Sequence, residues 1–408
     1  MARSVALASL RRLRTAGRVT TRTGDEVVAA DLLRVHPAHS MSERQILLAI
    51  GTRPEAIKLA PVALALRRES WAAVRILSTS QHRHLVQPAL ASFGIAVDRD
   101  LDVMRRGQSL VALCGRLMLA LDPAIVQERP DIAIVQGDTT TAFAVAFACA
   151  SHRVPVVHIE AGLRSGDRGQ PFPEEHNREL ITRVAARHYA PTESARQNLL
   201  REGIADASIA VVGNPVVDAL RLQEGVVDAS TFASTDGRRL VVVTAHRREN
   251  FGEPLRRICR AVRALADRPD VAVLFPTHLN PEARRVAEQE LGSHRHVRLV
   301  EPLDYPHMVA ALRACAFVMT DSGGLQEEAP ALGKPVLVLR NVTERPEGVA
   351  CGAARIVGTD EARIVAAAAS LLDDHVAYAA MAQVRHPYGA GDAAKKVVDD
   401  MRLRFADG

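Results

Sequence analysis

Short runs of aliphatic and β-branched residues alternate with longer segments of helical periodicity along most of this chain. In the first half, the apolar runs that predict strands are 45–50, 74–79, 132–135, 154–159 and 208–213. The helical segments between them include 54–68, 85–93, 109–128, 175–187 and 194–202. Repeated strand–helix units of this kind predict a parallel, doubly wound sheet.

A second series follows a break of polar and small residues at 223–237. Its predicted strands are 239–246, 271–278, 297–302, 316–322 and 335–340. The sequence therefore predicts an α/β protein of two Rossmann-like, doubly wound domains, 45–222 and 238–390, facing a central cleft and joined by the linker. Residues 391–408 hold an amphipathic helix that we expect to pack back on the first domain.

The N-terminal segment 1–44 does not fit this pattern. It holds seven arginines before residue 41 and no lysine, and Met41 stands just before the first predicted strand. We interpret it as a disordered or spurious extension, a transit-like presequence being the alternative.

Composition narrows the class of protein. The 408 residues are 48% hydrophobic and 24% charged, with a net charge of +5 and only 3% aromatic residues. No run of 18 uncharged apolar residues appears, so we expect no membrane span. The five cysteines are scattered, which argues against a zinc site or a disulfide framework and fits a reduced, cytoplasmic compartment. Nucleic-acid binding is not expected without a basic patch interleaved with aromatics.

Lysine is scarce in this chain. Of 52 basic residues only Lys58, Lys334, Lys395 and Lys396 are lysines. An ammonium and a guanidinium are not interchangeable at a tight site. We therefore interpret Lys58, inside the string GTRPEAIK, as functional. Lys334 fits equally well at the start of a strand.

Three acids lie in the stretch 135–178. Asp138 and Glu160 each follow a predicted buried strand, and Glu174 lies on a PFPEE turn. The carboxyl ends of parallel strands form the ligand-binding edge of such a sheet. The sequence thus predicts that three carboxylates meet at one small-molecule site, which suggests proton-transfer chemistry.

Two loops look suited to phosphate. Gly51 permits a tight turn in GTRPEAIK, from which Arg53 and Lys58 can reach an anion near a helix N-terminus. An ordinary strand–helix loop with surface cations is the alternative interpretation.

The string TDSGGLQEE is more specific. Here a strand is expected to end, Ser322, Gly323 and Gly324 form the turn, and a helix begins. Backbone N–H groups there can cradle a diphosphate. Glu328, one turn into the helix, is placed to accept hydrogen bonds from ribose hydroxyls.

His246, in TAHRREN, follows the first strand of the second series. It can donate to a diphosphate or protonate a departing one, whereas a structural capping role is the alternative. A metal site built from Asp138, His158, Asn214, His246 and His278 is disfavoured, because these residue types come singly and metal catalysis needs a tight ligand shell. We expect neither a metal nor a cofactor.

Together, nine strings resemble the non-hydrolysing UDP-N-acetylglucosamine 2-epimerases from about residue 45 to the C-terminus. They are GTRPEAIKLAP, SQHR, GDTTT, HIEAGLRSGD, PFPEEHNR, TAHRREN, PTHLNP, TDSGGLQEEAPALGKPVL and TERPEG. The resemblance implies the GT-B fold and reversible conversion of UDP-N-acetylglucosamine to UDP-N-acetylmannosamine. The route implied is anti elimination of UDP, a bound 2-acetamidoglucal and re-addition of UDP.

The resemblance also implies roles for individual residues. Asp138, Glu160 and Glu174 become the acid/base candidates, with Glu175 ranked below them, and His246 should contact the diphosphate. The residues expected to hold UDP are Arg53, Lys58, Ser322, Gly323, Gly324, Glu328 and Arg345.

Bacterial members of the family have a neighbouring activating site for the substrate. Gln81, His82 and Arg83 match that site, together with Gln108. Two departures put activation in doubt, because His84 replaces the usual glutamine and Gly107 stands where an arginine is usual.

Other functions stay open at this stage. A GT-B glycosyltransferase would need an acceptor, an epimerase of a related UDP-2-acetamido sugar would use the same machinery, and a sugar-nucleotide sensor would bind without turnover. The family implies a homodimer whose partners are UDP-N-acetylglucosamine and UDP, with no membrane partner. It also implies a place in cell-surface polysaccharide synthesis.

Overall fold

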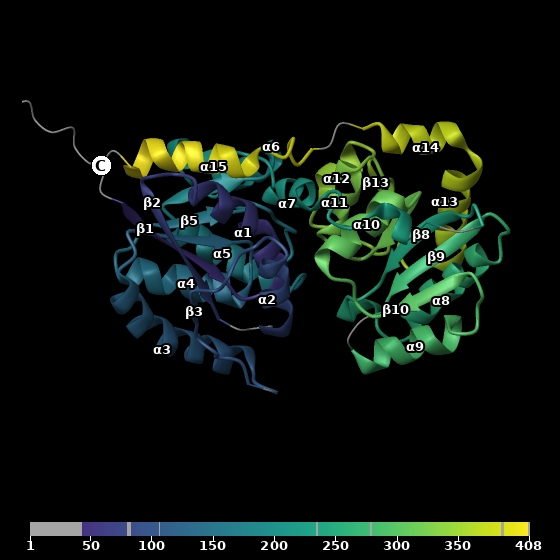
Figure 1. Ribbon diagram of the computed structural model, residues 1–408, viewed down its shortest axis with the longest axis horizontal. Helices are drawn as coiled ribbons and strands as arrows, with labels where there is room; N and C mark the ends of the chain where they lie inside the picture. Colours follow the sequence, from purple (N-terminus) through teal and green to yellow (C-terminus); the bar gives the residue numbers. More distant parts are fainter. Residues whose placement is uncertain are drawn as a thin grey trace, which may run out of the picture. The chain divides into compact units, whose positions relative to one another are not determined.

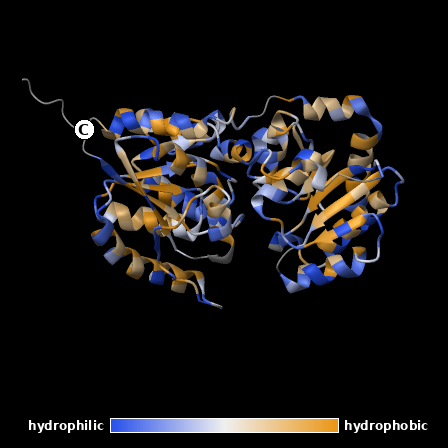
Figure 2. Ribbon diagram, in the orientation of Figure 1, coloured by the Kyte–Doolittle hydropathy of each residue, from blue (hydrophilic) through white to orange (hydrophobic). Residues whose placement is uncertain are grey.

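The protein is described here by a computed structural model, which places residues 43–79, 83–105, 107–233, 236–277, 280–384 and 387–406. These residues form two parallel β-sheets with helices packed against them (Figure 1). The strands are the most hydrophobic elements, and the helices mix polar and apolar positions (Figure 2). The predicted α/β class with two doubly wound parallel-sheet domains is confirmed.

The first sheet has seven strands in the order β3-β2-β1-β4-β5-β6-β7. Their bounds are β1 Arg44–Ile50, β2 Ala72–Ser78, β3 Arg99–Asp100, β4 Ile132–Gln136, β5 Val156–Ile159, β6 Arg187–Ala190 and β7 Ile209–Val211. The strand order reverses between β1 and β4. Ligands bind at such a switch point in open α/β sheets. The loops that follow β1 and β4 begin at this point, and the loop that follows β5 begins next to it.

The helices of this half cover both faces of the sheet. They are α1 Arg53–Leu66, α2 Arg83–Ala91, α3 Leu110–Glu128, α4 Thr140–Ser151, α5 Glu174–Val184, α6 Glu193–Arg201 and α7 Pro215–Gln223. Alternation along β1 explains the two layers, because successive side chains of a strand point to opposite faces. Ile46 and Leu48 join the core with α1, whereas Leu47 and Ala49 join the core with α3 and α4.

The second sheet has six strands in the order β10-β9-β8-β11-β12-β13. They are β8 Arg239–Thr244, β9 Val271–Pro276, β10 Val297–Val300, β11 Phe317–Thr320, β12 Val336–Val338 and β13 Ala354–Ile356. Its helices are α8 Glu253–Ala266, α9 Pro281–Leu291, α10 Tyr305–Ala314, α11 Leu325–Ala331, α12 Pro346–Ala350, α13 Glu361–Asp373 and α14 His375–Ala382.

The sequence prediction was wrong at a few elements. The helix expected over 175–187 ends at Val184, and Arg187 begins strand β6. This strand reads RHYA, and its buried Arg187 hides the apolar pattern of a core strand. The short strands β3 and β13 and the helix α7 were also missed.

The last helix, α15 (Ala393–Met401), returns to the first sheet. Its Val397 and Met401 are fully buried in the same core as Ile46 and Leu59. Asp400 accepts two hydrogen bonds from Arg187 of β6, at 2.8 and 2.7 Å, and one from the Tyr189 hydroxyl at 2.7 Å. Helix α15 therefore completes the core of the sheet domain with which the described chain begins.

Helix α3 is unusual for its surface. By length and composition it is apolar enough to cross a membrane, with a mean hydropathy of 1.6, yet only 28% of it is buried. The bent pair α13 and α14 passes the same test in the described residues. One or two such helices are weak evidence for a membrane, and α3 packs against α4 of the sheet domain.

Candidate active site

Glu160 is the centre of a buried polar network. It directly follows β5 with a φ of 65°, a left-handed conformation that is uncommon for a residue with a side chain. Its carboxylate accepts from Gln136 Nε2 at 3.1 Å and Asn214 Nδ2 at 3.0 Å, and it pairs with the Lys58 ammonium. Strained backbone at a sheet edge is typical of functional positions.

Two cations hold Glu160 in its charged form. Burial alone would raise the pKa of this carboxyl, but Lys58 and then Arg345, whose Nη2 lies 3.5 Å from Glu160 Oε1, lower the pKa below its ordinary value. The same neighbours act in return on Lys58: burial lowers its pKa, and Glu160 and Glu327 raise it above the ordinary value. Glu160 is therefore available as a proton acceptor at neutral pH.

Glu327 extends the network from α11. It is completely buried, accepts from Arg345 Nε at 2.8 Å and from Asn214 Nδ2 at 2.7 Å, and lies 3.8 Å from Lys58 Nζ. Glu344 accepts from Arg345 Nη1 at 2.7 Å. Residues from both sheet domains thus contribute to one charged cluster.

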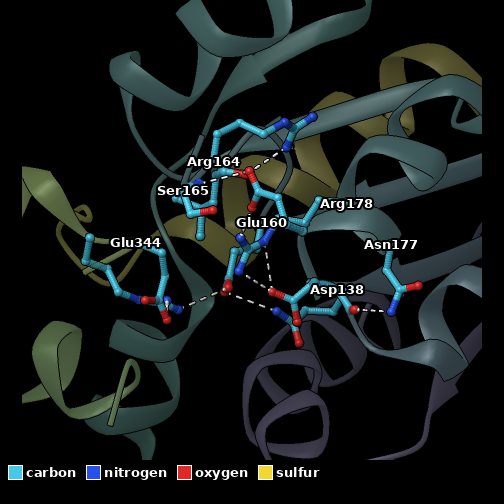
Figure 3. A network of polar contacts seen from close by, with 12 residues as sticks. Asp138, Glu160, Arg164, Ser165, Asn177, Arg178 and Glu344 are labelled. Carbon is cyan, nitrogen blue, oxygen red and sulfur yellow. Dashed lines mark hydrogen bonds and ion pairs between the residues drawn. The ribbon is translucent and has the colours of Figure 1, made fainter. Parts of the chain in front are cut away.

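Asp138 lies next to this cluster, one residue beyond the positive-φ Gly137 that follows β4. Arg178 of α5 donates to its carboxylate through Nε at 3.0 Å and Nη2 at 2.7 Å (Figure 3). Asn177 donates to the Asp138 carbonyl at 2.8 Å. Helix α5 therefore fixes both the backbone and the carboxylate of Asp138.

Glu174 and Glu175 have different surroundings, although they are neighbours. Glu175 is buried, accepts from the backbone N–H groups of Ser165 and Gly166 at 2.9 and 3.2 Å, and pairs with Arg178. Glu174 is half-buried at the first position of α5. Burial, followed by the nearby Asp138 charge, raises the pKa of Glu174 despite its own backbone N–H and two arginines. Glu175 thus holds the 162–166 loop, and Glu174 is the carboxyl of the pair biased towards protonation.

Arg53 and Glu328 influence each other electrostatically. The Arg53 guanidinium donates to the Leu303 carbonyl at 2.9 Å, and burial lowers its pKa although Glu328 opposes this. Burial, opposed by a contact with Tyr305, raises the pKa of Glu328 to about 7. Arg53 comes from the first sheet domain and Glu328 from the second.

The turn between β11 and α11 needs glycine at one position. A Cβ built on Gly323 would lie 2.8 Å from Arg345 Nη1 and 3.1 Å from Glu344 Oε1. Gly324 has more room, its nearest contacts being 3.9 Å away. Ser322 is anchored by its backbone N–H, which donates to the Thr320 hydroxyl at 2.9 Å. The turn is thus held against the charged cluster.

The two histidines at strand ends differ in exposure. His158 is fully buried on β5 and its Nε2 lies 2.8 Å from the Gly137 carbonyl. Burial lowers its pKa to about 4, so it is a neutral structural residue. The His246 side chain is 40% exposed, which suits contact with a ligand.

Of the predicted activating residues, Gln81 and His82 lie outside the described residues. Arg83 begins α2, and nothing is described of its side chain. Gln108 accepts from the Arg105 N–H at 3.3 Å and from Arg116. Substrate activation stays a prediction. Among the described residues no group of three or more His, Cys, Asp or Glu side chains is arranged to hold a metal ion.

Several residues of this site were missed from the sequence, namely Gln136, Arg178, Glu327 and Glu344. Glu327 is next to the predicted Glu328 in the sequence. Because neighbouring helical positions point in different directions, two adjacent glutamates indicate two different environments, and this was the signal that could have identified Glu327. Arg178 stands three positions after Glu175 in PFPEEHNR, the spacing of a helical ion pair.

Comparison with known proteins gives the family of this chain. Residues 64–402 match the family model described as UDP-N-acetylglucosamine 2-epimerase. The UDP-N-acetylglucosamine 2-epimerase of Escherichia coli K12 is 41% identical over 370 residues, which cover 88% of this chain and 98% of that protein. The Bacillus subtilis 168 enzyme of the same name is 41% identical, with coverages of 90% and 97%.

Solved structures show the same fold. The crystal structure of the UDP-GlcNAc 2-epimerase from Neisseria meningitidis, bound to UDP-GlcNAc, has a TM-score of 0.85 and 38% identity, covering 88% of this chain and all of that one. The glycosyltransferase SnogD from Streptomyces nogalater, at 19% identity and a TM-score of 0.56, shares the fold alone and covers 88% of this chain and 99% of its own. On these matches the chain belongs to the UDP-N-acetylglucosamine 2-epimerase family and has its two-domain GT-B fold.

Proposed function

We propose that this enzyme interconverts UDP-N-acetylglucosamine and UDP-N-acetylmannosamine by anti elimination of UDP and its re-addition to a bound 2-acetamidoglucal. The observation that carries the proposal is the contrast between two carboxyl groups. Lys58 and Arg345 favour the charged form of Glu160, whereas burial and Asp138 favour the protonated form of Glu174. Environments that push two pKa values apart mark a base and an acid.

In the elimination, Glu160 takes the C2 proton while the C1–O bond to the diphosphate breaks and a C1=C2 double bond forms. A proton then returns to C2 from the other side, and the diphosphate oxygen bonds to C1 again. Glu174 is the proposed donor for that step, and Asp138 raises its pKa. Because a C2 proton that is not next to a carbonyl is poorly acidic, the departing diphosphate must be strongly stabilised.

The proposed diphosphate site is built from residues of both sheet domains. Arg53, Lys58 and Arg345 supply positive charge, and the turn of Ser322, Gly323 and Gly324 supplies backbone N–H groups. Glu328 is proposed to accept from the ribose hydroxyls, and His246 to contact the diphosphate. Closure around the bound glucal would keep it from water.

The test is proton NMR of the chain with UDP-N-acetylglucosamine in D₂O with EDTA, beside a Glu160→Gln variant. We expect UDP-N-acetylmannosamine carrying deuterium at C2 for the wild type. The variant should turn over about 10²- to 10⁴-fold more slowly, the usual contribution of a general base, while UDP binding is retained. Glu179→Gln, half-buried at the α5 surface in an ion pair with Arg168, is the matched control.

Each contrary outcome is informative. A folded wild-type chain that yields neither product nor exchange refutes the proposal and favours a related UDP-2-acetamido sugar or an acceptor-dependent transferase. Near-normal turnover of Glu160→Gln would show that another group removes the proton.

We also propose that the protein is a homodimer in which α3 meets a second copy. Val111, Leu119 and Val126 of this helix are 83%, 79% and 58% exposed. They are eight and seven residues apart, so they lie near one face of the helix. A symmetric contact would cover this face, because a two-fold interface uses the same patch on both subunits.

Light scattering after size exclusion tests the assembly. We expect a dimer for the wild type and a monomer for Leu119→Asp, with Leu403→Asp, 76% exposed at the C-terminus, as control. A monomeric wild type, or a Leu119→Asp variant that stays dimeric, contradicts the proposal.

A further inference from the structure

A buried carboxylate that was not predicted as a site residue accepts hydrogen bonds from the segment that carries His246. Asp321 directly follows β11 and is 0% exposed. It accepts from the His246 backbone N–H at 2.9 and 3.1 Å, from the Arg247 N–H at 2.8 Å and from Asn250 Nδ2 at 2.9 Å. All of these donors belong to residues 246–250, so one side chain determines the path of this loop.

The sheet places Asp321 there. Strands β8 and β11 are neighbours with Thr244 opposite Thr320, and the two threonine hydroxyls are 2.6 Å apart. The residues that follow these strands must therefore lie side by side. Asp321 Oδ1 is 3.1 Å from His246 Nδ1, so the carboxylate meets the imidazole as well as its backbone.

This contact selects one form of the ring. A carboxylate accepts hydrogen bonds and does not donate them, so a neutral His246 must carry its proton on Nδ1, and Nε2 becomes the nitrogen that can meet a ligand. Burial lowers the pKa of His246, Asp321 raises it, and Arg247 and Arg340 lower it further. The arginines are themselves paired, Arg247 with Glu344 and Arg340 with Glu249 and Glu344.

The balance changes when an anion binds. A diphosphate near Nε2 adds negative charge on the far side of the ring and favours a second proton there. An imidazolium held between two anions is stabilised by both of them, and Asp321 already contacts Nδ1 in the ligand-free chain.

We propose that Asp321 is a positioning residue that acts through His246, fixing the Nδ1–H tautomer before binding and stabilising the imidazolium against the bound diphosphate. The second half of this inference rests on the proposed function, in which His246 contacts the diphosphate. The first half concerns the ligand-free chain alone.

Nitrogen NMR of the full chain with ¹⁵N-labelled histidine tests the tautomer directly, with His246→Gln assigning the signal by difference. We expect the Nδ1–H form in the ligand-free wild type and the imidazolium after saturation with UDP. In Asp321→Asn the amide oxygen still accepts backbone N–H groups, but the amide N–H faces Nδ1. The ring should therefore change to the Nε2–H form and remain neutral with UDP.

UDP affinity separates positioning from a merely structural role. We expect Asp321→Asn to weaken UDP about tenfold in the wild-type background, as for a charge-assisted hydrogen bond, and to have almost no effect in the His246→Gln background. Equal losses in both backgrounds overturn the proposal.

Two spectroscopic results decide the remaining cases. An Nε2–H tautomer in the ligand-free wild type overturns the inference even if Asp321→Asn does not fold. If UDP leaves the wild-type signal unchanged while Asp321→Asn changes the tautomer, the positioning role stands and the diphosphate contact of the proposed function fails.

Discussion

Replacing Lys58 with methionine tests the charged cluster around Glu160. Lys58 is 5% exposed, its ammonium pairs with Glu160, and it lies 3.8 Å from Glu327. Methionine is one heavy atom shorter than lysine, and it keeps an unbranched apolar side chain but removes the charge. Breaking a buried pair typically costs about 3–5 kcal/mol because the remaining charge is left uncompensated.

The structure places the expected cost at the lower end of that range. Glu160 keeps its hydrogen bonds from Gln136 and Asn214, and Arg345 Nη2 stays 3.5 Å away. We therefore expect Lys58→Met to lower the free energy of unfolding by about 3 kcal/mol at pH 8.

Urea unfolding supplies the measurement, and the chain offers a matched control. Lys395 pairs with Asp399 four residues on, but its side chain is 77% exposed, so Lys395→Met should cost only about 0.3–0.5 kcal/mol. Equal costs for the two variants would refute the reasoning.

The pH dependence has a definite sign. The pKa of Glu160 is lowered in the folded wild type, so the stability contributed by its charge is present above the pKa of an unfolded glutamate, about 4.3, and is lost as the pH falls through the folded value. In Lys58→Met the strongest of the groups that lower this pKa is removed, so the buried Glu160 takes up a proton at a higher pH than in the wild type. The difference in stability between Lys58→Met and the wild type should therefore shrink as the pH falls from 8, and it should go on shrinking below about pH 4.3. A difference that stays constant from pH 8 to below pH 4 would contradict this account.

Two further changes give independent checks. Gly162→Ala should lower the free energy of unfolding by about 2 kcal/mol or more, because Gly162 has a φ of +87° and an added Cβ would lie 2.3 Å from the Ala195 carbonyl oxygen. The control is Gly203→Ala, where φ is +82° and nothing lies within 4 Å of the added Cβ, so only the backbone cost of about 1 kcal/mol is expected. Equal losses in the two variants would contradict this reasoning. Burial raises the pKa of Glu328 to about 7, so the unfolded chain loses this proton at a lower pH than the folded chain does. The free energy of unfolding of the wild type should therefore fall as the pH rises from about 4.5 to 7. Glu328→Gln should remove that fall and be more stable than the wild type by about 2–3 kcal/mol at pH 8, as urea unfolding across the pH range will show; a pH dependence identical to that of the wild type would mean that Glu328 does not titrate there.

The sequence was sufficient for the fold and for residues at strand ends. Apolar runs located most strands, and Asp138 and Glu160 were singled out because they lie within two residues of the ends of β4 and β5. Partners far along the chain were not predictable in this way. Arg178 and Asp138 are 40 residues apart, and Asn214 and Glu327 are 113 apart.

The sequence alone does not distinguish a buried charged side chain from an exposed one. Glu327 and Asp321 are 0% exposed, yet each belongs to a polar string that suits a solvated turn equally well. Their burial depends on three-dimensional pairing, which a local pattern does not contain. The same holds for Arg187, whose charge made β6 look unlike a strand. Its partner Asp400 is 213 residues away in the chain.

The return of α15 to the first sheet has a consequence for synthesis on the ribosome. The first sheet emerges first, but Val397, Met401 and Asp400, which cover its β6 side, are among the last residues made. The elements of the second sheet, from β8 to α14, are contiguous in the chain and can complete their own core earlier. The first sheet domain therefore cannot complete its core until the last helix has been synthesised. A nascent chain that stops before α15 would leave this core uncovered.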